Sequence, residues 1–202
     1  RYNIWSRLAA ASVALVLLLT LCPAAVAAER TLTVTTAEQL EELAKKCASD
    51  TYSKGLTVLL GQDIDLGSKA VSIPIFLGTF DGQGHRISGL SLTGNDSQIG
   101  LFSQIESGAT VKNLTVSGEV TPGGSQSCVG GIAGVNRGSI TDCRFSGVVI
   151  GDNSVGGITG LNDAGGTISG SAVTGAVRGT QSTGGVAGEN AGMLLRCTSS
   201  AA

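Results

Sequence analysis

The sequence predicts an all-β solenoid, because it combines a repeat, a high glycine content and a short repeat length. Four similar segments begin at Ile99, Val129, Val155 and Thr183, at offsets of 30, 26 and 28 residues, and such periods are typical of solenoids and propellers. Glycine occurs 31 times and would cost a helix about 1 kcal/mol per residue relative to alanine. A propeller blade takes about 40–45 residues, more than each repeat offers. We therefore expect each repeat to form one solenoid coil, with three short strands joined by tight turns.

The composition of the 202-residue chain excludes several other classes of protein. Charged residues make up 14% of the chain and the formal net charge is −2, which argues against nucleic acid or an anionic membrane surface as a partner. Disordered chains are rich in charge and poor in apolar residues, whereas this chain is 42% hydrophobic and weakly charged. The glycines lack the strict three-residue period of collagen. We expect a folded protein with no nucleic-acid partner.

Residues 1–28 have the features of a secretory signal peptide. Arg1 and Arg7 precede an uncharged run over residues 8–21, and the triplet at residues 25–27 reads Ala-Val-Ala, as a signal-peptidase site does. The alternative, a membrane anchor, would need a run of about 20 apolar residues. Leu21 stands before Cys22 where a lipoprotein signal would place a small residue, so lipidation is not expected. These features predict a secreted or cell-surface protein with no membrane span in the mature chain.

Residues 36–49 are expected to form one amphipathic helix. Its start fits a capping box, made either by Thr36 with Gln39 or by Thr35 with Glu38. Apolar residues recur at the spacing of one helix face, and they are Leu40, Leu43, Ala44 and Cys47. Cys47 on that face is most simply a buried small apolar residue. We expect the helix to cap one end of the solenoid and to keep its open edge from pairing with other chains.

Short strands are expected on both sides of this helix, at residues 31–35, 56–60 and 62–67. The expected organisation is therefore a signal peptide at 1–28, a cap helix with the first coils at 29–98, and repeat coils at 99–202. The last repeat stops at Ala202 before it is complete, from which we expect the native protein to continue.

Alignment of the repeats predicts which side chains stack on one another. Neighbouring coils lie about 4.8 Å apart, so equivalent residues form columns along the solenoid axis, and no coil can bury its apolar side alone. Three inward columns are expected: Phe102, Ile132, Ile158 and Val186; Leu114, Cys143, Ser171 and Cys197; and Val116, Phe145, Val173 and Ser199.

The second of these columns bears on the cysteines. Cys143 and Cys197 are separated by the coil that carries Ser171, which places them about 9.6 Å apart along the axis. A disulfide needs Cα atoms within about 7 Å of each other, so both are predicted to be free, buried thiols. His85 is the only histidine and no CxxC pair occurs, so the sequence offers no Cys/His zinc site.

A polar position also recurs, at Asn136, Asn162 and Asn190, with Glu106 in the first copy. Asparagine tolerates the left-handed backbone of tight corners, and its stacked amides can hydrogen-bond from coil to coil. We interpret the row as a structural ladder. The alternative is a row of amides that binds a ligand.

Tests for catalytic motifs give no catalytic, cofactor-binding or metal-binding residue. An HExxH zinc motif needs two histidines, and the chain has only His85. No GxSxG elbow occurs either. Most carboxylates are dispersed. Two weak clusters remain, and their simpler interpretation is a solvated surface: Asp142 with Arg144 and Arg196, as a polysaccharide-cleaving site, and Asp63 with Asp65, as a calcium site.

The segment VGGIAGVNRGSITDCRFSGVV and its neighbours resemble the GLUG-type repeat of bacterial secreted and surface proteins. The resemblance implies a right-handed parallel β-helix, an extracellular or cell-wall location, and a role in adhesion or display. A host or cell-wall glycan or protein would then be the partner. Related coils also occur beside the protease domain of IgA-specific metallopeptidases. The alternative function is therefore an accessory region of a larger secreted metallopeptidase or glycan-active enzyme.

Overall fold

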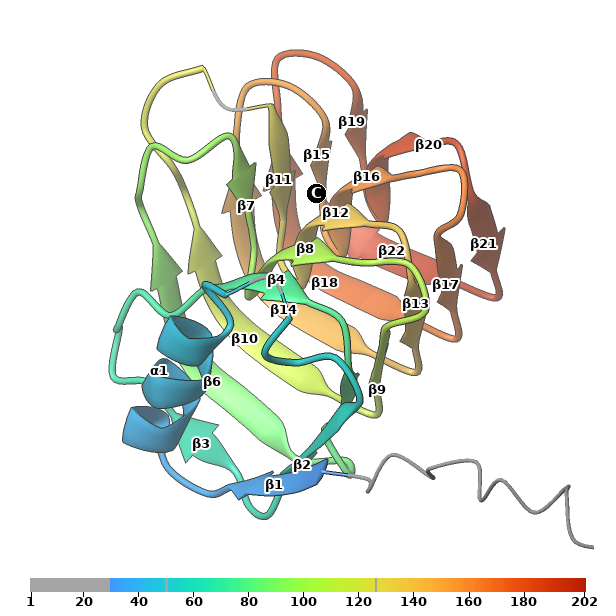
Figure 1. Ribbon diagram of the computed structural model, residues 1–202. Coiled ribbons are helices and arrows are strands. Elements are labelled where there is room, and N and C mark those ends of the chain that lie inside the picture. Colours follow the sequence, from blue (N-terminus) through green and yellow to red (C-terminus); the bar gives the residue numbers. More distant parts are fainter. Residues whose placement is uncertain (1–29, 50, 126) are drawn as a thin grey trace, which may run out of the picture.

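The computed structural model describes residues 30–49, 51–125 and 127–202, and these residues form a parallel β-helix (Figure 1). The predicted fold class is confirmed, including the short helix near the N-terminus. The expected signal peptide lies outside the described residues. Within the described part of the chain, no helix has both the length and the apolar character needed to cross a membrane.

The strands of the described residues stack into four parallel sheets, here called A to D. Sheet A contains β1 (Arg30–Val34), β2 (Leu56–Leu60), β5 (Thr79–Asp81), β9 (Thr110–Lys112), β13 (Ser139–Thr141), β17 (Thr167–Ser169) and β21 (Met193–Leu195). Sheet B contains β3 (Ile64–Asp65), β6 (Arg86–Leu92), β10 (Thr115–Val120), β14 (Arg144–Ile150), β18 (Ala172–Arg178) and β22 (Thr198–Ala201). Sheet C contains β4 (Ile73–Phe76), β8 (Phe102–Ile105), β12 (Ala133–Asn136), β16 (Thr159–Asn162) and β20 (Ala187–Asn190). Sheet D contains β7 (Gln98–Ile99), β11 (Cys128–Gly130), β15 (Val155–Gly156) and β19 (Thr183–Gly184).

Each complete coil passes through sheets D, C, A and B in that order, so it has four strands and not the three that we expected. The difference arises at a glycine corner that divides one apolar segment into two strands. In the coil formed by β11 to β14, the fourth from the N-terminal end, this corner lies between β11 and β12, at Gly131. A Cβ there would overlap the ring of Phe145 and lie 2.6 Å from the carbonyl oxygen of Gly157. Glycine therefore lets the chain turn while the Phe145 ring fills the space inside.

Helix α1 (Ala37–Lys46) covers the end of the solenoid formed by the earliest coils, beside β3 and β4 (Figure 1). Thr36 is the N-cap, and its hydroxyl accepts a 3.3 Å hydrogen bond from the backbone N–H of Gln39. The Gln39 side chain accepts in return from the backbone N–H of Thr35 at 2.7 Å. Beyond Lys46 the backbone bonds tighten to i→i+3 turns, which explains why the helix stops before the expected residue 49.

The apolar face of α1 is buried as expected, since Leu40 and Cys47 have no exposed surface and Leu43 has 1%. Lys69 fastens the helix to the loop after β3, with its ammonium 3.3 Å from Glu38 and 2.8 Å from Glu41. The helix thereby closes the apolar interior at this end. At the opposite end β21 has a neighbouring strand on one side only, and Met193 is 53% exposed.

Sheet B contains a column of glycines in the middle of its strands, at Gly118, Gly147 and Gly175. Their φ angles are 151°, 155° and 117°, a region that residues with a side chain rarely adopt. A Cβ on Gly147 would overlap the carbonyl oxygen of Gly118 and lie 2.9 Å from its carbonyl carbon. Close approach of successive coils therefore depends on glycine at this position.

We predict that Gly147→Ala lowers the free energy of unfolding by about 2–4 kcal/mol, because the added Cβ strains φ and presses on the coil below. Gly94→Ala is the matched control, since its Cβ would meet only a carboxylate oxygen at 3.7 Å. Urea unfolding followed by circular dichroism measures both variants. An equal, small loss in the two would contradict the proposed role of the glycine column.

Candidate functional site

The recurring asparagines form a continuous row of side-chain amides at the corner that follows sheet C. Asn136 donates from Nδ2 to Oδ1 of Asn162 at 2.8 Å, and Asn162 donates in the same way to Asn190 at 2.7 Å. Asn136 and Asn162 have no exposed surface. Oδ1 of Asn136 also accepts from the backbone N–H of Gly138 at 3.2 Å. The two buried amides thus use their polar atoms inside the solenoid, where a ligand would not reach them.

The observed columns of stacked side chains depart from the repeat alignment in the third coil, which is formed by β7 to β10. Ile132, Ile158 and Val186 occupy equivalent places, each one residue before the paired positions 133, 159 and 187. Phe102 does not join them, because it pairs with Ala133. The same shift places Ile105 opposite Asn136, so Glu106 follows the asparagine row without belonging to it.

The register of Phe102 shifts because the corner before it is one residue shorter than in the next coil. Two residues separate Ile99 from Phe102, whereas three separate the paired residues Val129 and Ala133. The ring of Phe102 contacts Phe76 and Phe80, with centroid distances of 5.3 and 5.4 Å. This aromatic cluster fills the interior below the glycine-rich coils.

The cysteine column follows the expected order, with Leu114, Cys143, Ser171 and Cys197 one residue before the paired strands of sheet B. All four cysteines among the described residues, Cys47, Cys128, Cys143 and Cys197, are free thiols. Cys143 is fully buried, and burial raises the pKa of its thiol to about 12. Cys197 is only partly buried, because it lies in the last described coil.

The remaining chemical candidates lie apart or are already occupied by local hydrogen bonds. Asp63 accepts from the backbone N–H of Arg86 at 3.0 Å and lies 3.1 Å from Nδ1 of His85; both contacts lower the pKa of Asp63. Asp65 accepts from the backbone N–H of Gly67 at 3.0 Å. Among the residues that the structure describes, no group of three metal-ligating side chains occurs. None of the ion pairs found in this part of the chain joins Asp142, Arg144 and Arg196 to one another.

An arginine that the sequence reading did not select links three coils on the outer surface. Arg137 lies 2.9 Å from Glu106 of the third coil and 3.1 Å from Asp163 of the fifth. It also donates to Oε1 of Gln104 at 3.0 Å. A backbone N–H at Ala164 and the Arg137 guanidinium together lower the pKa of Asp163. The signal was present in the repeat alignment, since all of these residues lie near the polar corner position.

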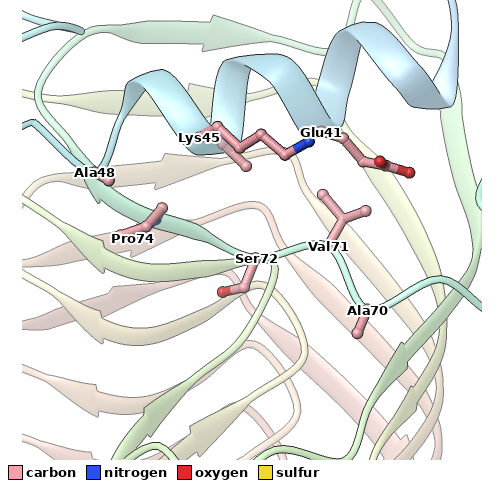
Figure 2. A pocket seen from close by; sticks show the side chains of 8 residues that line it. Glu41, Lys45, Ala48, Ala70, Val71, Ser72 and Pro74 are labelled. Atoms are coloured by element: carbon pink, nitrogen blue, oxygen red, sulfur yellow. The ribbon is translucent and has the colours of Figure 1, made fainter.

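Two adjoining hollows lie on the outer side of sheet C near the N-terminal end. The first, of about 310 Å³, lies between α1 and the segment that leads into β4; Figure 2 shows Glu41 and Lys45 of the helix above Val71 and Ser72. The second, of about 500 Å³, shares Ser72 and Pro74 with the first. It extends to the start of β7, where Gln98 lines it. The shared residues make the two hollows continuous with each other.

Comparison with known proteins assigns the repeat. The family model described as the GLUG motif matches residues 125–150. Halomucin from Haloquadratum walsbyi is 36% identical to this chain over 90 residues, which are 44% of this chain and 1% of Halomucin. The crystal structure of a proposed immunoglobulin A1 protease from Bacteroides ovatus matches with a TM-score of 0.54 at 18% identity. The match covers 84% of this chain and 75% of that one, and at this identity it shows the fold alone.

The fold and its interior columns define a stacked-coil β-solenoid. The chain is a parallel β-helix that carries a GLUG motif at residues 125–150. It spans about 1% of the length of the curated relative that it matches.

We predict that Asn162→Ala lowers the free energy of unfolding by about 2–3 kcal/mol, because it removes the 2.8 Å acceptor of the buried Nδ2 of Asn136 and leaves that group only the Thr167 carbonyl oxygen at 3.4 Å. Asn153→Ala serves as the control, since this loop side chain makes no hydrogen bond with the described residues. Chemical denaturation compares the two. A loss of stability no larger in Asn162→Ala would argue that the row is not a structural ladder.

We predict that Cys143→Ser weakens the dependence of stability on pH above about pH 9. The folded chain favours the neutral thiol, so this stabilisation is complete below the ordinary thiol pKa of 9.0 and is lost as pH rises toward 12. Unfolding free energies between pH 8 and 10.5 should fall by about 2 kcal/mol more in the wild type than in the variant. Ser171 occupies the same column, so the variant residue fits. Parallel pH profiles would contradict the prediction.

Proposed function

We propose that these coils are a non-catalytic extracellular segment that displays or spaces a binding surface of a secreted or cell-surface protein. The observation that carries the proposal is that the recurring side chains pack and bond inside the solenoid. The buried asparagines bond from coil to coil, the buried thiols are neutral, and the apolar columns fill the interior. Repetition here builds length and rigidity, and the chemistry of recognition is left to the outer faces.

An extracellular location is supported by the expected leader at residues 1–28 and by the resemblance to repeats of secreted and surface proteins. The similarity to Halomucin and the fold shared with a proposed immunoglobulin A1 protease point in the same direction. A stacked β-helix suits this setting, because its parallel ladders leave few exposed strand edges along its length.

A second function is favoured by one specific observation, the structural match to the proposed protease. Coils of this kind could belong to a larger secreted metallopeptidase or glycan-active enzyme, in which they would hold a separate catalytic domain. Digestion of immunoglobulin A1 by the secreted full-length product of the source organism tests this role. Cleavage that is lost when residues 99–202 are deleted supports it, and cleavage that persists unchanged contradicts it.

We predict that antibodies against the described coils label intact cells that produce this chain, or precipitate it from their culture medium, without permeabilisation. An antibody against a cytosolic protein of the same cells is the control and should label only after permeabilisation. Labelling of this chain that also requires permeabilisation would overturn the extracellular role.

A further inference from the structure

We propose that the second hollow, between sheet C and the segment before β7, binds a neutral oligosaccharide. This hollow, here called the sheet C groove, has a volume of about 500 Å³ and is lined in part by Pro74, Ile75, Asp96, Ser97, Gln98 and Gln104. Ligand sites of this kind are typically about 300–1,000 Å³, so a short sugar chain fits. The proposal rests on the proposed function and assigns that function a ligand.

Polar groups that lack a protein partner line one wall of the sheet C groove. Asp96, Ser97 and Gln98 are consecutive, and their side chains make no hydrogen bond with the other described residues. Their carboxylate, hydroxyl and amide groups offer both acceptors and donors. Sugar hydroxyl groups also donate and accept, so a wall of mixed polarity can bind neighbouring hydroxyls of one ring.

The side of the lining formed by β8 and the segment before β4 is fixed by hydrogen bonds within the protein. Gln104 directs Oε1 to Arg137, which leaves its two amide N–H donors available to the groove. The hydroxyls of Ser72 and Ser103 lie 3.1 Å apart, and Ser72 also donates to the carbonyl oxygen of Gly100 at 2.7 Å. In Figure 2 the Ser72 hydroxyl points away from α1. A wall held in this way loses little side-chain entropy when a ligand binds.

An apolar surface completes the groove. Pro74 and Ile75 are half-buried residues of β4 on the lining. A proline ring and an aliphatic side chain can pack against the C–H face of a sugar ring, since both are apolar. Ile75 of β4 pairs with Gln104 of β8, so apolar and polar side chains lie side by side on the lining, as an amphipathic sugar requires.

Charge distinguishes a neutral sugar from other ligands. Among the described residues that line the groove, Asp96 is the only charged one, so a sialylated or uronic glycan would meet repulsion. Nucleic acid is disfavoured for the same reason.

The test uses the full chain on a glycan array, followed by titration of the bound sugars. The array has three arms: neutral animal glycans, neutral microbial and plant oligosaccharides, and acidic glycans. We expect binding in at least one neutral arm and none in the acidic arm. The double variant Asp96→Ala/Gln98→Ala should weaken binding at least tenfold, whereas Asp96→Asn should retain most of it, because an amide still bonds to sugar hydroxyls.

Thr174→Ala is the matched control, because Thr174 is an exposed residue on β18 of sheet B and is not on the groove. Circular dichroism and thermal unfolding verify that every variant folds. Silence in both neutral arms, or binding that the double variant leaves unchanged, overturns the assignment. If antibodies still label the chain on intact cells, such a result removes the sheet C groove and leaves the proposed function standing; failure of the labelling itself removes the function.

Discussion

The rest of this structure depends on the in-register stacking of parallel coils. One coil cannot enclose an apolar interior, so each gains its buried surface only from the coils on either side. The consequence is visible along one column of sheet A: Ile140 and Ile168 are fully buried between neighbours, whereas Leu194, their equivalent in the last described coil, is 38% exposed. At the other end α1 supplies what a further coil would supply, an apolar face over the open interior.

Stacking at strand spacing also governs which side chains the chain can carry. Where backbones approach most closely, as at Gly131 and Gly147, only glycine fits. Where a polar side chain must turn inward, the same spacing lets Asn136 and Asn162 satisfy each other. The glycine and asparagine content thus follows from geometry, and the outer grooves remain the surfaces on which recognition can vary without disturbing the interior.

Much of this architecture could be predicted from the sequence, because repetition shows directly which residues are equivalent. The local pattern of apolar residues predicted β2 at residues 56–60 and the helix face that buries Leu40, and the repeat alignment predicted the order of the cysteine column. Corners were harder to predict. One residue of difference before Phe102 shifts its register, and the fourth strand of each coil depends on a glycine turn that resembles a continuous strand in sequence. The sheet C groove was not predictable at all, because Gln98 and Pro74 come together only through the path of the coils.

Oxidative crosslinking tests the stacking most directly. Ser117 and Ser146 are paired neighbours in sheet B, and Thr174 pairs with Ser146 from the next coil. Ser117→Cys with Ser146→Cys places the two cysteines one strand spacing apart, about 4.8 Å, whereas Ser117→Cys with Thr174→Cys places them about 9.6 Å apart. Mild oxidation and mass-spectrometric mapping should find a disulfide in the first double variant and none in the second. Equal crosslinking in both, or none in the first, would contradict the in-register stacking of the coils.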